Sequence, residues 1–138
     1  MPTDDELRSI YSDTKTIAIV GASSDPSKAA HSIPAYLQEQ GFRIVPVSPR
    51  GGELFGEAVA TSLGEIDGGV DVVDVFRPAE EAVSIAQQAV AIGAKVMWLQ
   101  AGVSSEEAAE VAREGGLQVV MDMCMGDTHR RLFPPDSA

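Results

Sequence analysis

Small, hydroxylated and basic side chains gather directly after the first apolar run of the chain. Residues 17–20 are β-branched or small and apolar, and the run ends at Gly21. The loop that follows consists of Ala22, Ser23, Ser24, Asp25, Pro26, Ser27 and Lys28. A buried strand that leads through such a loop into a helix start builds an anion site, because backbone amides converge there and the helix dipole favours negative charge. Residues 15–28 therefore predict a site for an anion.

The loop matches neither of two common phosphate-binding fingerprints. It has only one glycine, Gly21, where G-x-G-x-x-G needs three, and it lacks the G-K-[ST] ending of a P-loop. Its serine hydroxyls can still bond phosphate oxygens, and Lys28 can reach them. The alternative is a plain helix-entry turn capped by Asp25 and serine side chains. The position after the first strand favours the phosphate interpretation.

An arginine stands where an NAD site usually has an acidic ribose ligand. The apolar run 43–48 ends in Pro49 and Arg50, followed by two glycines. NAD-binding sites carry Asp or Glu at this place, whereas arginine can pair with a phosphate on the adenosine ribose. Arg50 therefore excludes ordinary NAD and leaves NADP or coenzyme A as ligands. The alternative is that Arg50 is a solvated turn residue.

An aromatic residue, an arginine and a proline stand together where the apolar run 70–76 ends. Phe76 can lie against an adenine ring or a pantetheine arm, Arg77 adds a third cation, and Pro78 suits a helix start. The alternative is strand-end packing for Phe76 and a local salt bridge for Arg77. After the run 95–99, Gln100 opens a turn of small residues that leaves room beside the first strand.

Hydrophobic patterning places these loops at the ends of strands. A capping box at Thr3 and Glu6 predicts a helix over 3–12, and Pro34 predicts that the next regular helix starts near Ser32, since proline is tolerated in a first turn. Ser104 is the expected N-cap of a helix ending at 114. The remaining elements are strands at 16–20, 43–48, 70–76, 95–99 and 117–121, helices to 40 and over 79–92, and a short strand or bridge within 57–63.

The strands are near-continuous apolar runs, which is typical of a parallel sheet covered on both faces. We predict an α/β fold with a doubly wound, Rossmann-like parallel sheet of five main strands, in the order 3-2-1-4-5 when numbered along the chain. Residues 1–138 form one domain, with the leading helix in 1–13 and a frayed tail in 133–138. Ligands on such sheets bind at the carboxyl ends of the strands, beside the first strand.

The composition of the chain limits the kinds of molecule that it is expected to bind and the compartment in which it is expected to work. A formal net charge of -11 argues against nucleic acid and anionic membranes as partners, which need a basic face. No apolar run reaches the roughly 18–20 residues of a membrane span, and the start of the chain does not resemble a signal peptide. The single cysteine, Cys124, allows no internal disulfide, so we expect a cytoplasmic protein. A homodimer is compatible with the hydrophobic edges of the sheet.

Four stretches occur in one order along the chain: KTIAIVGASSDPSK, RIVPVSPR, DVVDVFRP and KVMWLQAGV. Together they resemble the small single-domain CoA-binding proteins, relatives of the CoA-binding domain of the succinyl-CoA synthetase alpha subunit, over about residues 15–132. Ser48 departs from the asparagine more usual in that family. The resemblance implies a coenzyme A site formed by Gly21, Ala22, Ser23, Ser24, Lys28, Ser32, Val47, Pro49, Arg50, Phe76, Arg77, Pro78 and Gln100. The ligase relatives carry a phosphorylated-histidine loop and an ATP-grasp partner, which this chain lacks, so ligase activity does not carry over.

Few side chains suggest catalysis. Cys124 is expected to be a small buried hydrophobe among methionines; the alternative is a mixed disulfide with the pantetheine thiol. His31 either bonds a phosphate or lies on the surface, and residues 129–131 are expected to pair with surface carboxylates. No His, Cys or carboxylate set has metal-ligand spacing, and no catalytic set is evident.

Three functions remain open on this basis. The first is a binding module for coenzyme A or an acyl-CoA without catalytic machinery. The second is an NADP-dependent oxidoreductase or reductase subunit, although the chain offers no acid group near the fourth strand and no substrate domain. The third is a regulatory or scaffold protein with a vestigial pocket.

Overall fold

The computed structural model describes residues 2–135 and contains a parallel sheet of five strands, which confirms the predicted fold class. The strands lie in the spatial order β2-β1-β5-β6-β7. Every neighbouring pair is parallel. Their bounds are β1 Thr16–Val20, β2 Arg43–Val47, β5 Val72–Val75, β6 Val96–Leu99 and β7 Gln118–Val120.

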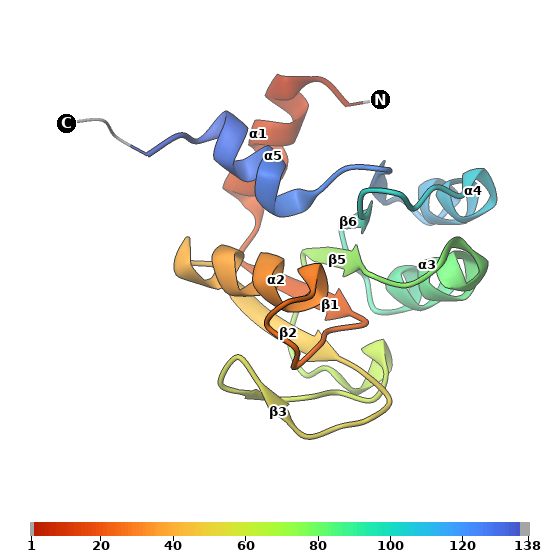
Figure 1. Cartoon of the computed structure of the whole chain (residues 1–138). Coiled ribbons are helices and arrows are strands. Elements are labelled where there is room, and N and C mark those ends of the chain that lie inside the picture. Colours follow the sequence, from red (N-terminus) through yellow and green to blue (C-terminus); the bar gives the residue numbers. More distant parts are fainter. Residues whose placement is uncertain (1, 136–138) are drawn as a thin grey trace.

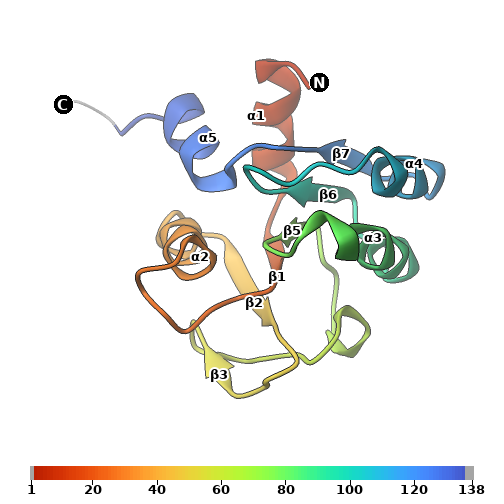
Figure 2. The ribbon, with the colours of Figure 1, turned by 45° about the vertical axis from the view of Figure 1, so that its right-hand side comes forward.

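Helices cover both faces of the sheet, and each face has its own hydrophobic core (Figures 1 and 2). One core packs beneath α1 Asp4–Asp13, α2 Ala29–Glu39 and α5 Met125–Leu132. Trp98 lies fully buried in that core. The other core packs beneath α3 Ala82–Ala91, which follows η2 Ala79–Glu81, and α4 Glu106–Glu114.

The strand order differs from the expected one: β5 lies between β1 and β6, not outside β2. The outer edge of β2 is occupied instead by the connection that follows it, where Val47 forms a parallel bridge with Ala60. The Ala60 amide donates to the Pro46 carbonyl at 3.0 Å. The expected extra strand within 57–63 is thus confirmed, as β4 Glu57–Ala58 pairs with β3 Glu53–Leu54 and leads into that bridge.

The carboxylate of Asp71, just before β5, accepts hydrogen bonds from the start of β1. The amides of Lys15 and Thr16 donate to one oxygen of Asp71, at 2.9 and 3.0 Å. Because the chain continues to one side after β1 and to the other after β5, the connections diverge between these two strands. In doubly wound sheets the ligand site lies at that divergence. The site is therefore expected between the ends of β1 and β5.

Several helix boundaries differ from the sequence predictions. Helix α2 begins at Ala29, so the expected regular start near Ser32 is wrong and Pro34 lies inside the helix. The N-cap of α4 is Ser105, not Ser104, and its hydroxyl accepts from the Ala108 amide. The predicted helix over 79–92 begins with the 3-10 turn η2 before α3. The capping box of α1 at Thr3 is confirmed.

Helix α5 was not expected, and it changes the role of the basic cluster at 129–131. Arg130 and Arg131 pair with Asp127 and Asp4, as predicted. His129 instead is buried, and its Nδ1 lies 2.8 Å from the Tyr36 hydroxyl of α2. Burial and the adjacent Arg130 charge lower the pKa of His129. The cluster therefore joins α5 to α1 and α2. The frayed tail was expected at 133–138, and residues 136–138 lie outside the described part of the chain.

Candidate functional site

Two adjoining cavities open at the carboxyl ends of the strands. The larger, which we call the polar cleft, has a volume of about 940 Å³ and lies between the loop after β1, the loop after β2 and the start of α3. The smaller, the apolar pocket, has a volume of about 310 Å³ and lies between the start of α2, the ends of β5 and β6, and the residues before α5. Phe76 and Arg77 line both cavities, so the two form one continuous site.

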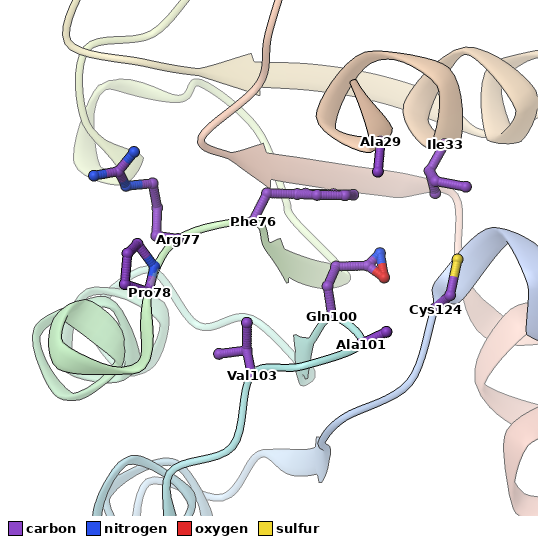
Figure 3. A pocket seen from close by; sticks show the side chains of 9 residues that line it. All are labelled: Ala29, Ile33, Phe76, Arg77, Pro78, Gln100, Ala101, Val103 and Cys124. Carbon is purple, nitrogen blue, oxygen red and sulfur yellow. The ribbon is translucent and has the colours of Figure 1, made fainter. Parts of the chain in front are cut away.

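All but one of the predicted site residues line these cavities. Those of the polar cleft are Gly21, Ala22, Ser23, Ser24, Lys28, Val47, Pro49, Arg50, Phe76 and Arg77. Pro78 and Gln100 line the apolar pocket (Figure 3). Ser32 lines neither cavity and is exposed on α2. Its place in the expected site came from the family resemblance alone.

Gly21 permits the close approach of the loops that follow β1 and β5. Its φ is +90°, in the region that favours glycine, and a Cβ there would lie 2.7 Å from Cδ of Arg77 and 3.1 Å from the Phe76 carbonyl. The Gly21 amide donates to the Val47 carbonyl at 3.0 Å. Three strand ends therefore meet at Gly21, directly below the polar cleft.

The loop between β1 and α2 is stabilised by its own side chains. The Ser23 hydroxyl accepts from the Asp25 amide at 3.1 Å, and the Asp25 carboxylate accepts from the amide and the hydroxyl of Ser27. The two hydrogen bonds from Ser27 lower the pKa of Asp25. The turn-capping interpretation is thus correct for Asp25 and Ser27. It leaves Ser24 and Lys28 exposed on the wall of the polar cleft.

Pro34 leaves one carbonyl of α2 free to accept a hydrogen bond from the loop after β1. Because proline has no N–H, it cannot bond the carbonyl of Ala30, which is its usual partner inside a helix. The Ser23 amide donates to that carbonyl instead, at 3.1 Å. His31 adds a second link: its Nδ1 lies 2.7 Å from the Ser23 carbonyl, and its ring packs against Phe55. His31 thus positions the loop backbone.

The N-terminus of α2 lies at the junction of the two cavities. Among the described residues, no side chain caps the start of this helix at Lys28. Ala29 lines the apolar pocket and Ala30 the polar cleft, so the helix start lies where the two cavities adjoin. Uncapped amides and the helix dipole make this point favourable for an anion.

The cations of the polar cleft differ in their partners. Arg77 pairs with Glu81 one turn along the chain, with 2.6 Å between Nη2 and Oε2, so the salt-bridge alternative for Arg77 is correct. Within residues 2–135, Lys28 and Arg50 have no carboxylate at ion-pair distance, and both are exposed. Lys28 and Arg50 are therefore available to an anion without breaking an existing pair.

Besides Arg77, the apolar pocket has two uncharged side chains with polar or sulfur atoms on its wall, Gln100 and Cys124. Gln100 Oε1 accepts from the Met125 amide at 3.0 Å, whereas its Nε2 is buried without a hydrogen-bond partner in the described structure. Cys124 is half-buried at this pocket, and its Sγ accepts from the Asp127 amide at 3.4 Å, which caps α5. Burial raises the pKa of the Cys124 thiol, so the less reactive thiol form prevails at neutral pH.

Asp74 is a buried acid that sequence reasoning missed. It lies opposite Trp98, on the face of the sheet that also carries Phe76 and Gln100, and it is fully buried. Neither carboxylate oxygen has a hydrogen-bond partner in residues 2–135, and burial raises the pKa of Asp74 well above its ordinary value. The signal in the sequence was a single acidic residue inside the apolar run 70–76.

The described residues hold neither a metal-binding cluster nor a membrane-spanning helix. No group of three or more His, Cys, Asp and Glu side chains is arranged to hold a metal ion. No helix is long and apolar enough to cross a membrane.

Comparison with known proteins identifies relatives across nearly the whole chain. The CoA binding domain family matches residues 15–130. The uncharacterized protein YneT of Bacillus subtilis is 37% identical over 93% of this chain and 95% of its own length. A solved structure from Thermus thermophilus, cell-free ID.343, superposes with a TM-score of 0.92 at 43% identity, covering 96% of this chain and all of the other.

A longer enzyme subunit is similar over one part of its length. The alpha subunit of the ADP-forming acetate–CoA ligase II of Pyrococcus furiosus is 30% identical over 84% of this chain. The match spans only 28% of that subunit. The shared part is thus about the size of one domain of the ligase.

Proposed function

Because the chain belongs to the CoA-binding domain family, we propose that it binds coenzyme A or an acyl-CoA across the two adjoining cavities. The diphosphate lies at the uncapped start of α2, near Ser24 and Lys28. Arg50 binds the phosphate on the adenosine ribose, and the pantetheine arm passes Phe76 toward the apolar pocket.

One observation carries this proposal: the polar cleft brings two unpaired cations and an uncapped helix start to the same cavity. Lys28 and Arg50 lie on opposite loops of the cleft, after β1 and β2. In a chain with a net charge of -11, a cavity with this set of groups is suited to a ligand that carries separate phosphates. Coenzyme A has both a diphosphate and a ribose phosphate.

Binding is the function that we propose, and catalysis is not part of it. The similarity to the acetate–CoA ligase subunit covers 28% of that protein, so its activity gives no basis for assigning a reaction to this chain. Among the described residues, no serine, threonine or cysteine side chain is hydrogen-bonded to a histidine ring. We therefore expect a cytoplasmic carrier, sensor or binding subunit for CoA.

Isothermal titration calorimetry with CoA, dephospho-CoA and NADPH tests this function. We expect CoA to bind tightly and dephospho-CoA to bind more weakly, by about 1–3 kcal/mol, because the contact of Arg50 with the ribose phosphate is lost. Tight NADPH binding without a response to CoA would favour the oxidoreductase alternative. The absence of heat from all three would favour a vestigial pocket.

A matched pair of arginine variants separates a specific contact from a general charge effect. Arg50→Ala should weaken CoA binding by about the same 1–3 kcal/mol and leave dephospho-CoA almost unaffected. Arg113→Ala removes the same charge from an exposed position on α4 and should change neither affinity. Equal losses for CoA and dephospho-CoA in Arg50→Ala would show that Arg50 does not bind the ribose phosphate.

A further inference from the structure

The apolar pocket is suited to an uncharged group. Of the 9 residues that line it, only Arg77 carries a charge, and that charge is paired with Glu81 outside the pocket. Ala29, Ile33, Phe76 and Val103 supply apolar walls, which Figure 3 shows around the side chain of Gln100. A free carboxylate or phosphate would find no unpaired cation here. The pocket therefore favours a small apolar group.

Gln100 adds one specific polar requirement. Its amide orientation follows from the hydrogen bond to the Met125 amide, since only Oε1 can accept from an N–H. Nε2 is consequently the group without a partner, on a residue that is 5% exposed. A buried amide donor without a partner is unfavourable. Nε2 is closed to solvent in this structure, and Gln100 lines the pocket, so a small shift of its side chain brings Nε2 to a carbonyl oxygen of the occupant. The occupant should therefore present a carbonyl beside an apolar group.

We propose that the apolar pocket binds the acyl end of a short-chain acyl-CoA, with the thioester carbonyl accepting a hydrogen bond from Gln100 Nε2. This inference rests on the proposed function, because the pocket adjoins the polar cleft through Phe76 and Arg77. A volume of about 310 Å³ accommodates the end of the pantetheine arm together with a chain of a few carbons. The protein is then a receptor for short acyl-CoA in preference to free CoA.

Three ligands test the two parts of this inference by calorimetry on the full chain: CoA, butyryl-CoA and the thioether S-butyl-CoA. Butyryl-CoA should bind about tenfold more tightly than CoA, since its chain leaves water. S-butyl-CoA keeps the chain but lacks the carbonyl, and it should bind about fivefold more weakly than butyryl-CoA. Equal affinities for butyryl-CoA and S-butyl-CoA would overturn the role of Gln100.

Two alanine-to-leucine substitutions test whether the preference for butyryl-CoA arises in the apolar pocket. Ala101→Leu fills the pocket from an exposed turn. It should weaken butyryl-CoA about tenfold more than it weakens CoA, because the acyl chain loses its space, so the preference for butyryl-CoA disappears. Ala91→Leu makes the same change at an exposed position that lines neither cavity, and it should leave both affinities unchanged. CoA that binds without any preference for butyryl-CoA would overturn the acyl pocket alone. A chain that binds none of the three ligands would overturn the proposed function as well.

Discussion

The polar cleft and the apolar pocket share two residues but are built in opposite ways. The polar cleft is formed by exposed loops, and the side chains of its cations are exposed to solvent. Glu80 and Glu81 also line this cleft. The apolar pocket is formed by strand ends and helix starts, and Gln100 Nε2 on its wall is buried without a hydrogen-bond partner among residues 2–135. Charge governs the first cavity, whereas shape and a single hydrogen bond govern the second.

The contrast indicates that one cavity provides most of the affinity for the ligand, whereas the other provides the selectivity. Exposed charges attract an anion over several ångströms and are screened by salt, so the polar cleft suits any ligand with phosphates in the right places. A buried donor without a partner discriminates strongly, because a ligand that lacks the acceptor leaves it unsatisfied. We therefore expect the polar cleft to hold the common part of the ligand and the apolar pocket to distinguish its variable end.

The largest expected effect comes from closing the junction of the two cavities. Gly21→Ala should lower the free energy of unfolding by about 1–3 kcal/mol and weaken CoA binding, because the new Cβ meets Arg77 and the Phe76 carbonyl at a positive φ. Gly41→Ala is the matched control, with a φ of +102° and no atom within 4 Å of the new Cβ. Urea unfolding and calorimetry should show a larger loss for Gly21→Ala in both measurements. Equal stability losses and unchanged CoA affinity would show that the close approach at Gly21 is unimportant.

The second effect concerns the fully buried carboxyl of Asp74. Burial raises the pKa of Asp74 in the folded state, so the unfolded chain ionises first. The contribution of Asp74 to stability is therefore full below about pH 4 and is lost progressively as the pH rises toward the folded-state pKa. Asp74→Asn should match the unmodified chain near pH 4 and exceed its free energy of unfolding by about 1–3 kcal/mol at pH 7.

Urea unfolding at several pH values between 4 and 7 measures this difference. The exposed Asp67→Asn serves as the control and should show no such widening. A gap for Asp74→Asn that stays constant with pH would contradict a neutral, buried carboxyl.

The third effect tests the claim that charge governs the polar cleft. Glu81→Gln removes the carboxylate that pairs with Arg77, and it should tighten CoA binding by about two- to fivefold at low salt. The gain should shrink in 0.5 M salt, because screening weakens exposed charges. Glu110→Gln, on the exposed side of α4, should have little effect. A salt-independent gain would point to a change of shape rather than of charge.

The smallest effect concerns the anchoring of the loop after β1. In Pro34→Ala, the new amide can bond the Ala30 carbonyl within α2, in competition with the Ser23 amide. Hydrogen exchange should then show about tenfold lower protection of the Ser23 amide, with CoA binding about twofold weaker. Unchanged protection at Ser23 would show that the loop does not depend on Pro34.

The sequence predicted the elements around the site more securely than their arrangement. The strand-turn-helix at residues 15–28, Arg50 after the second strand and Phe76–Arg77 after the third all follow from local composition. Sequence reasoning placed β5 outside β2, because it could not show that Ala60 occupies that edge. It also assigned Pro34 to a first turn, because the partner of the freed carbonyl, Ser23, lies in a separate loop.

What the sequence alone determined is the set of residues that an anion requires and their order at the strand ends. These depend on neighbours along the chain: an apolar run, a glycine, hydroxyls and a helix start. Only the tertiary structure decided that, within the described part of the chain, Gln100 Nε2 and Asp74 have no partners, that Arg77 is paired and that Lys28 is not. Hydrogen-bond partners, ion-pair partners and burial depend on segments that are distant in sequence. Burial is what makes the Gln100 amide discriminate between ligands with and without a carbonyl.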